Sequence, residues 1–253
     1  MESVPLEQHQ EHAKRLASIY GVTAALHAED HMLRHFLEMN SENGLWHYFN
    51  GGYNDAAQLM TEIEKLGVDL QNLSVLEFAS GYGRLTRHLK RLCNLSTSDI
   101  HSEAVEFVDK HCGVRTYQSS SNAEELKIDG QFDVVAVISL FSHLPDQTFG
   151  PWLAALYRLV GPGGHLIFTT VGDAAREINP TIAVPGPDGF IFTRDSEQKD
   201  IDGGEYGNTT ARPHYVGFQI GKWLPSSKLV SYGSGTWWKY QDQYVVHKPS
   251  TER

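Results

Sequence analysis

A loop of small residues gives the clearest chemical signal in this sequence. It lies in the run Val75-Leu76-Glu77-Phe78-Ala79-Ser80-Gly81-Tyr82-Gly83-Arg84, where an apolar strand pattern leads into a helical pattern. Small residues let the backbone approach a ligand, and the N–H groups at a helix start attract a carboxylate or phosphate. Asp99 ends the next apolar run, at about the 20-residue distance at which an acidic side chain reaches a ribose. Aspartate is also a common helix N-cap, so a capping role is the alternative.

A second group of polar residues follows the fourth apolar run, in the segment Ser139-Leu140-Phe141-Ser142-His143. Ligands of open α/β sheets bind beyond the carboxyl ends of the strands, which predicts that this segment faces the site. His143 is the natural candidate for a general base, because a free histidine has a pKa of about 6.5. A histidine before Leu-Pro can equally cap a helix or bind a loop, so both readings stay open.

The elements that would position these residues follow a βαβ pattern, with short apolar runs separated by helical periodicity. Strands are predicted at Ser74–Phe78, Leu95–Asp99, Val114–Tyr117, Phe132–Ile138 and His165–Thr170. A helix at Pro213–Trp223 and two strands at Lys228–Tyr232 and Gln243–Val246 follow. We therefore expect a doubly wound, Rossmann-like α/β fold with a seven-stranded sheet, mostly parallel and closed by a C-terminal antiparallel hairpin.

Two further segments lie outside this pattern. Residues 1–66 have helical periodicity and predict an N-terminal helical cap or lid, which leaves 67–253 as the main domain. Periodicity fails at about 172–211, where Gly, Pro and Asp are frequent, and a long loop of this kind is usually functional or disordered. Gly161-Pro162-Gly163-Gly164 is expected to end the preceding helix. Trp237 and Trp238 lie in the turn of the closing hairpin, where they would pack on the domain, contact a sugar-like acceptor or meet a partner subunit.

Composition excludes several classes of function. The 253 residues include 21 Lys and Arg against 31 Asp and Glu, a formal charge of −10 that would repel a phosphate backbone. The nearest approach to a basic cluster, Arg84, Lys90 and Arg91, is expected on a solvated helix face. Two cysteines and 13 scattered histidines predict neither a disulfide framework nor a metal site. Without a signal peptide or membrane span in the sequence, we expect a cytoplasmic protein with no membrane or nucleic-acid partner.

The sequence from Leu73 to Val171 resembles the class I S-adenosylmethionine-dependent methyltransferases. The resemblance rests on EFASGYGR, TSDIH, FDVVAVISLFSHLP and LYRLVGPGGHLIFTT. It is strongest to a bacterial branch with S-x-F-[ST]-H-L-P after the fourth strand and Q-D-x-Y-V near the end. Ala79 departs from the family pattern, which usually has glycine there, so the loop must accept one Cβ atom.

This resemblance implies S-adenosylmethionine as the cofactor and assigns roles to several residues. Phe78, Ala79, Gly81 and Gly83 would line its methionine part, Glu77 would support the loop, and Asp99 would bind both ribose hydroxyls. Ile100 would lie against the adenine, and a serine of the run Ser119-Ser120-Ser121 would contact its amino group, although a serine-rich turn can be only a turn. The full predicted cofactor set is Glu77, Phe78, Ala79, Ser80, Gly81, Gly83, Arg84, Asp99, Ile100, Ser120, Ser139 and Leu140.

The acceptor side is predicted from where loops fall in this fold. His143 is the catalytic candidate, and the substrate-binding candidates are Tyr48, Tyr53, Phe141, Tyr206, His214 and Tyr215. Aromatic clusters are also common in cores, and polar loops are often only solvated. The sequence thus predicts methyl transfer to an oxygen, in preference to a nitrogen, of a polar small molecule or saccharide, without a metal. A homodimer is compatible with it, and the alternative is an inactive binding or scaffolding module.

Overall fold

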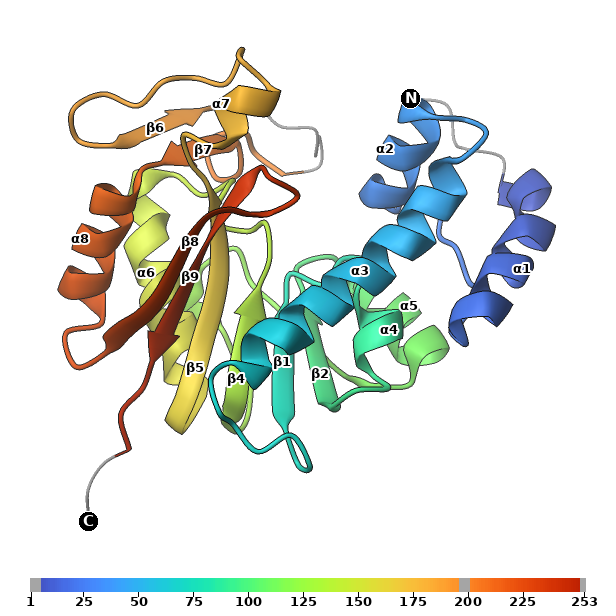
Figure 1. Cartoon of the computed structure of the whole chain (residues 1–253), viewed down its shortest axis with the longest axis horizontal. Coiled ribbons are helices and arrows are strands. Elements are labelled where there is room, and N and C mark those ends of the chain that lie inside the picture. The colour runs from blue at the N-terminus through green and yellow to red at the C-terminus, as the bar shows by residue number, and fades with distance from the viewer. Residues whose placement is uncertain (1–5, 196–200, 251–253) are drawn as a thin grey trace. The chain divides into compact units, whose positions relative to one another are not determined.

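The computed structural model describes residues 6–195 and 201–250 and contains two compact units, Met1–Ser119 and Ser120–Arg253 (Figure 1). The first unit comprises η1 (Leu6–His9), α1 (Gln10–Tyr20), α2 (His31–Met39), α3 (Gly44–Glu64), β1 (Ser74–Phe78), α4 (Thr86–Leu89), β2 (Asn94–Asp99), α5 (Ser102–Cys112) and β3 (Arg115–Gln118). The second comprises η2 (Ala123–Glu125), β4 (Phe132–Val137), α6 (Asp146–Arg158), β5 (Val160–Val171), α7 (Ala175–Ile178), β6 (Phe190–Thr193), β7 (Asn208–Ala211), α8 (Pro213–Trp223), β8 (Lys228–Trp237) and β9 (Gln241–His247).

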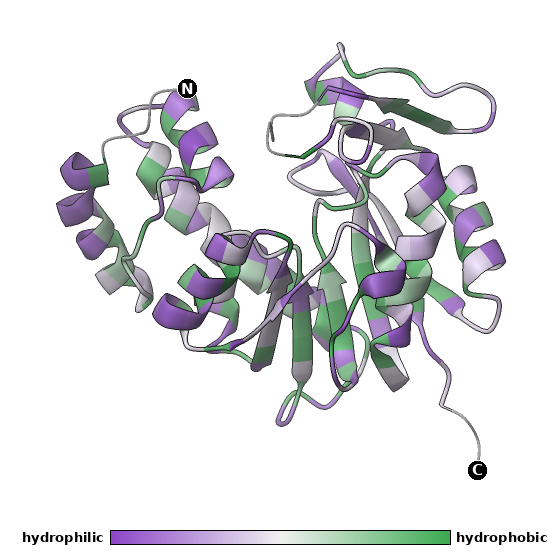
Figure 2. Cartoon of the chain, turned by 180° about the vertical axis from the view of Figure 1, so that it is seen from behind, coloured by the Kyte–Doolittle hydropathy of each residue, from purple (hydrophilic) through white to green (hydrophobic). Residues whose placement is uncertain are grey.

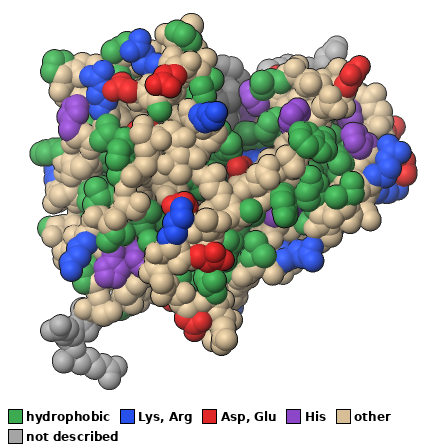
Figure 3. All heavy atoms as spheres, viewed as in Figure 1, with side chains coloured by type: hydrophobic (Ala, Val, Ile, Leu, Met, Phe, Trp, Pro, Cys, Tyr) green, Lys and Arg blue, Asp and Glu red, His purple; other side chains and the backbone are tan. Residues whose placement is uncertain are grey.

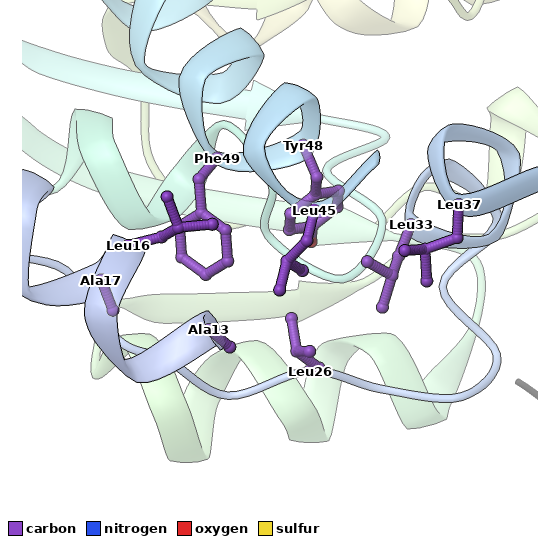
Figure 4. Packing of buried hydrophobic residues seen from close by; sticks show 9 residues of the cluster. All are labelled: Ala13, Leu16, Ala17, Leu26, Leu33, Leu37, Leu45, Tyr48 and Phe49. Carbon is purple, nitrogen blue, oxygen red and sulfur yellow. The ribbon is translucent and has the colours of Figure 1, made fainter. Parts of the chain in front are cut away.

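The N-terminal helices α1, α2 and α3 form an apolar core within the first unit. Gly21, with a left-handed φ of 65°, is the C-cap of α1, and Asp30 is the N-cap of α2, where its carboxylate accepts the N–H of Leu33 at 3.0 Å. Figure 2 shows hydrophobic and hydrophilic stretches alternating along these helices, as amphipathic helices require. Their buried side chains converge in Figure 4: Ala13, Leu16, Ala17, Leu26, Leu33, Leu37, Leu45, Tyr48 and Phe49.

Three parallel strands in the order β3-β2-β1 form the sheet part of the first unit. Phe78 pairs with Ser98, and Asp99 with Gln118, so β1 and β2 end side by side. The buried side chains of β1 and β2 agree with a sheet covered on both faces. The loop after β1 and the carboxylate at the end of β2 are consequently neighbours.

The second unit places β4 parallel to β5 and closes with antiparallel strands. Strand β9 pairs antiparallel with both β5 and β8, which confirms the predicted C-terminal hairpin. The hairpin is longer than predicted, because pairing continues to Trp237 and Gln241 at its turn. Trp237 is fully buried, whereas Trp238 is 43% exposed.

The segment 172–211 is more regular than the sequence indicates. It contains α7 and the antiparallel strands β6 and β7, and Val171 at the end of β5 pairs with Thr210. The described residues therefore form nine strands where seven were predicted. These short strands escape detection because the run Phe190-Ile191-Phe192 has no alternating polar residues, and their pairing partners lie far along the chain. The predicted loop within 196–200 lies outside the described residues.

Two predicted boundaries are also wrong. Strand β5 begins at Val160 and includes the Gly161-Pro162-Gly163-Gly164 run, which was expected only to end a helix. The spacing of Leu85, Leu89 and Leu92 predicts one helix face, but α4 is a single turn that ends at Leu89, and Leu92 is 48% exposed. The carbonyl of Leu159, directly before β5, accepts the N–H of Phe132 at 2.8 Å, so the chain already bonds to β4 where β5 begins.

Charged groups of both signs are interspersed over the face shown in Figure 3. Among the described residues, no three His, Cys, Asp or Glu side chains are grouped as metal ligands. No helix within residues 6–195 and 201–250 has the length and apolar character needed to cross a membrane.

Candidate active site

The loop after β1 turns through three residues with left-handed backbone. Their φ angles are 60° at Ala79, 53° at Gly81 and 77° at Gly83. Backbone bonds fix the loop, because the N–H of Ser80 donates to the carbonyl of Ser98 at 3.1 Å. A left-handed conformation costs an alanine about 1 kcal/mol or more, whereas glycine adopts it freely. A Cβ atom at Gly81 would meet no described atom within 4 Å beyond its chain neighbours, so the backbone is open to a ligand there.

Asp99 lies directly against this loop. Its Oδ2 accepts the N–H of Gly81 at 2.7 Å, and its Oδ1 accepts the N–H of His101 at 3.0 Å. Helix α5 begins at Ser102 with His101 as its N-cap, so Asp99 does not hold the capping position. The structure therefore brings together the two predicted features, the glycine loop and the acidic strand end.

Glu77 lies beneath the loop and is 4% exposed. The hydroxyl of Thr86 donates to its Oε2 at 2.7 Å, which links β1 to the first residue of α4. Burial raises the pKa of Glu77 from 4.5 to about 8, although the Thr86 bond and the charge of Arg84 act in the opposite direction. This position suits the loop-supporting role that the resemblance implies.

Arg84 connects the loop to helix α3. Its guanidinium forms an ion pair with Asp55 at 2.6 Å, and both side chains are largely buried. A Cβ atom at Gly52 would collide with the carbonyl oxygen of Arg84, so α3 packs directly on the loop backbone. The expectation that Arg84 lies on a solvated helix face is wrong, because α3 covers it.

Arg87 is a fully buried residue that holds the loop from a second side. Its Nε donates to the carbonyl of Gly83 at 3.1 Å, and its Nη1 donates to the carbonyls of Thr23 and Ala25 at 3.2 and 3.3 Å. Its Nη2 donates to the hydroxyl of Tyr48 at 3.1 Å. A buried guanidinium requires such acceptors, so Arg87 joins the segment before α2 to the glycine loop.

The predicted aromatic residues of the N-terminal cap differ in their placement. Tyr48 is fully buried and donates to Asp30 at 2.6 Å, as part of the helical core. Tyr53 is 49% exposed, and its ring lies 5.3 Å from that of Tyr20 and 6.0 Å from that of His88. Of the two, only Tyr53 presents a surface to a ligand without rearrangement of the core.

Three predicted cofactor residues flank the loop or follow the strands. Phe78 is buried at the end of β1, and Ile100 is half-buried with its carbonyl bound to the side chain of Gln118. The hydroxyl of Ser120 donates to Glu125 at 3.2 Å and accepts the N–H of Asn122 at 3.1 Å. Ser120 thus stabilises a turn in this structure, while its contact with an adenine stays a prediction.

In the second unit, a ring of hydrogen bonds holds the end of β4. The N–H of Ser139 donates to Thr169 Oγ1 at 2.9 Å, and the Thr169 hydroxyl donates to Gln241 Oε1 at 2.6 Å. Gln241 Nε2 then donates to Ser139 Oγ at 2.7 Å. Ser139 has a left-handed φ of 67°, so these bonds keep it in an unfavourable conformation. The next residue, Leu140, is half-buried.

His143 and Tyr206 come together in the same unit. Their rings are stacked, with centroids 4.4 Å apart and planes inclined by 10°. The Nδ1 of His143 lies 2.7 Å from the carbonyl oxygen of Gly207, which can only accept, so Nδ1 carries a proton. In the neutral ring, the basic lone pair is therefore on Nε2.

The other three acceptor-side candidates occupy different environments. Phe141 is fully buried and packs on Phe149 and Phe168, each at 4.9 Å between centroids. Tyr215 is 7% exposed and donates to Asp146 at 2.6 Å, which ties α8 to α6. His214 is exposed on the first turn of α8. Phe141 and Tyr215 are therefore buried packing residues, and His214 is the accessible member.

Arg87 bonds to the glycine loop, and Thr169 and Gln241 bond to Ser139, although nothing in their local sequence marks these residues. Arg87 is part of a helical pattern in which a basic residue usually faces water. The bond from Thr169 to Gln241 joins residues 72 positions apart, so only tertiary structure shows it. Sequence patterns predict elements and loops, but not such long-range polar contacts.

Comparison with known proteins finds similarity over part of the chain. Residues 75–164 match a family model described as a methyltransferase domain. A ubiquinone biosynthesis O-methyltransferase from Ralstonia nicotianae is 31% identical over 103 residues, which make up 38% of this chain and 42% of the relative. The chain matches less than half of the length of such curated relatives.

Solved structures show the same fold. An S-adenosylmethionine-dependent methyltransferase from Clostridium acetobutylicum has a TM-score of 0.56 at 14% identity, over 78% of this chain and 92% of that one. The glycopeptide N-methyltransferase MtfA complexed with S-adenosyl-L-homocysteine has a TM-score of 0.57 at 14% identity, over 78% and 90%. The chain therefore has the Rossmann-like α/β fold of these structures, and the predicted fold is confirmed.

Proposed function

We propose that this chain is an S-adenosylmethionine-dependent methyltransferase that methylates an oxygen, in preference to a nitrogen, of a polar small molecule or saccharide. The contact between Gly81 and Asp99 is the main support for this proposal, because it places a carboxylate that could bind a ribose beside a loop whose backbone is open to a ligand. The methyltransferase domain over residues 75–164 supports the same conclusion.

The residues of the first unit that would bind S-adenosylmethionine suit its chemical groups. Asp99 is held by two backbone N–H groups, so its carboxylate is oriented before a ribose diol arrives and can accept from both hydroxyls. The open space at Gly81 allows close approach of the methionine part, and Arg84 and Glu77 support the loop from below. When bound, S-adenosylmethionine supplies an electrophilic methyl group on a sulfonium.

His143 is proposed to act on the acceptor. Its Nδ1 proton is committed to Gly207, so Nε2 is the nitrogen that takes a proton from the acceptor hydroxyl. This nitrogen would hold the proton that the acceptor hydroxyl releases when its oxygen receives the methyl group and the sulfonium becomes a neutral thioether. The protein's main contribution is alignment, since positioning can supply about 7–11 kcal/mol of the barrier reduction.

The acceptor class follows from Tyr206, which stacks on His143, and from the exposed His214 of the same unit. Tyr206, stacked on His143, and the exposed His214 offer ring faces and hydrogen-bonding groups, as a polar ring-containing acceptor requires. The curated relatives are named ubiquinone biosynthesis O-methyltransferases, which favours an oxygen as the methylated atom.

Two measurements test this function. Calorimetric titration with S-adenosylmethionine is expected to show stoichiometric binding, and absence of binding would contradict the proposal. Transfer of a radiolabelled methyl group to a panel of hydroxylated metabolites and sugar nucleotides should then identify the acceptor. Cofactor binding without transfer to any acceptor would instead indicate the inactive binding module.

A further inference from the structure

The carboxylate of Asp99 accepts hydrogen bonds from one side chain as well as from the backbone. Its Oδ2 accepts the N–H of Gly81 at 2.7 Å, and its Oδ1 accepts the N–H of His101 at 3.0 Å. The Nδ1 of the His101 ring lies 3.1 Å from the same Oδ1. An ionised carboxylate can only accept, so this Nδ1 carries a proton and donates it to Asp99.

These bonds leave too few acceptor positions on Asp99 for a ribose diol. The two oxygens of a carboxylate together offer about four positions for hydrogen bonds. The two backbone N–H groups use two of them, and the His101 ring uses another. A single position then remains for two hydroxyl groups. Both hydroxyls can bind only if one of the present donors leaves the carboxylate.

Of these donors, the imidazole ring is the one that can move by itself. The N–H of Ser80, next to Gly81, donates to the carbonyl of Ser98 at 3.1 Å, which fixes the loop. The carbonyl of His101 accepts the N–H of Val105 at 3.1 Å, which fixes its backbone at the start of α5. The ring of His101 is 28% exposed, so rotation about its side-chain bonds can turn it towards water. Its departure therefore needs no change in the backbone.

The position of His101 in the helix supports the same conclusion. It is the N-cap residue of α5, but its side chain forms no hydrogen bond with the N–H groups of the first helical turn. Residues at this position usually stabilise the helix by such a bond, and histidine is not among the preferred types. The ring of His101 bonds instead to Asp99, whose side chain is 7% exposed. The ring thus serves the carboxylate rather than the helix end.

We propose that the imidazole of His101 competes with a ribose hydroxyl of the cofactor for Oδ1 of Asp99 and turns away when the cofactor binds. The inference rests on the proposed function, because it takes Asp99 as the ribose-binding residue. An O–H bond from the ribose replaces the N–H bond from the ring, so the carboxylate stays fully hydrogen-bonded. S-adenosylmethionine and S-adenosylhomocysteine carry the same ribose. The competition therefore lowers the affinity for both, and it favours release of the product.

Calorimetric titration of the full chain with S-adenosylhomocysteine tests this competition. His101→Ala removes the ring, and His101→Phe keeps a ring that has no donor. Both variants are expected to bind about three- to tenfold more tightly than the wild type, because no bond to the carboxylate has to be broken first. His111→Ala, the same substitution in the last turn of α5, is the matched control and should bind like the wild type.

Two further measurements show whether the effect passes through Asp99. When Asp99→Asn is already present, the addition of His101→Ala should change the affinity by less than about twofold, because the two residues act on one interaction. Nitrogen NMR of the chain with isotope-labelled histidine gives a direct signature. The Nδ1 signal that is missing from His101→Ala belongs to His101, and in the wild type it should shift when S-adenosylhomocysteine is added.

Several outcomes would overturn the inference. Weaker binding by His101→Ala would show that the ring holds the carboxylate in place for the ribose. A gain in His101→Ala that His101→Phe lacks, or an equal gain with Asp99→Asn present, would show steric obstruction instead of competition for Oδ1. An unchanged Nδ1 signal at saturation would show that the ring stays on Asp99. A wild type that binds neither S-adenosylmethionine nor S-adenosylhomocysteine contradicts the proposed function, whereas normal binding with an unaltered His101→Ala contradicts only this inference.

Discussion

The imidazole of His143 lies flat against the phenol ring of Tyr206, with ring centroids 4.4 Å apart. The two residues are 63 positions apart in the sequence, yet the carbonyl of Gly207, next to Tyr206, also binds the Nδ1 of His143. The same segment therefore fixes both the plane and the protonated nitrogen of the histidine. This arrangement fixes the direction in which Nε2 of the proposed base can accept a proton.

Removal of the proposed base should slow the reaction without weakening donor binding. We expect His143→Ala to lower kcat by about 10²–10⁴-fold, the usual contribution of a general base, with an unchanged Kd for S-adenosylmethionine. His35→Ala, at an exposed position of α2, is the matched control and should keep a rate near that of the wild type. A His143→Ala rate within a few fold of the wild type would remove His143 as the base.

The carboxylate of Asp99 should dominate affinity for the cofactor. Asp99→Asn keeps the size of the side chain but removes the charge that strengthens bonds to hydroxyl donors. We expect the Kd for S-adenosylmethionine to rise by about 10–100-fold, measured by calorimetry. The control is Asp109→Asn on the exposed side of α5, which should bind like the wild type. Equal affinities in both variants would show that Asp99 does not bind the ribose.

Adjacent glycines of α3 should respond in opposite ways to alanine. A Cβ atom at Gly52 collides with the carbonyl oxygen of Arg84, so Gly52→Ala should destabilise the chain by about 1–3 kcal/mol and weaken cofactor binding. At Gly51 the nearest atom is Arg84 Nη1 at 3.3 Å, the end of a flexible side chain. Gly51→Ala should therefore be neutral or stabilising, by up to about 1 kcal/mol. Urea unfolding and calorimetry measure both effects, and equal stability of the two variants would contradict close packing of α3 on the loop.

Burial of Glu77 should make stability depend on pH. Below pH 4.5 both the folded and the unfolded chain hold this proton, so its contribution to stability is intact. As the pH rises from 4.5 to about 8, the unfolded chain loses the proton first, and the free energy of unfolding falls. Above about pH 8, the ionisation of Glu77 no longer lowers the free energy of unfolding.

The substitution Glu77→Gln isolates this effect, since glutamine resembles the protonated carboxyl. We expect a flatter stability profile between pH 4.5 and 8 and a higher free energy of unfolding than the wild type at pH 8. Glu106→Gln, at an exposed position of α5, should leave the wild-type profile in place. Parallel profiles for Glu77→Gln and the wild type would show that Glu77 is ionised in the folded chain at neutral pH.

The sequence was sufficient to predict that the glycine loop and the acidic strand end lie together, and less so for the environments of the acceptor-side candidates. Glycine loops and acidic strand ends are local patterns, so Gly81 and Asp99 could be predicted from spacing alone. The roles of Phe141 and Tyr215 depend on which face of an element is covered, and both side chains are buried. The hydrogen bonds that join Gln241, Thr169 and Ser139 could not be predicted, because these residues lie in three separate strands or strand ends.

Arg87 has a consequence for how the first unit unfolds. Its guanidinium takes acceptors both from the segment before α2 and from the glycine loop, so separating the two would leave a buried cation without them. Hydrogen exchange should accordingly protect α3 and β1 to a similar degree, as one cooperative block. The N-terminal helices then contribute to the folding stability of the glycine loop. Shortening the chain from its N-terminal end would therefore also disrupt this loop.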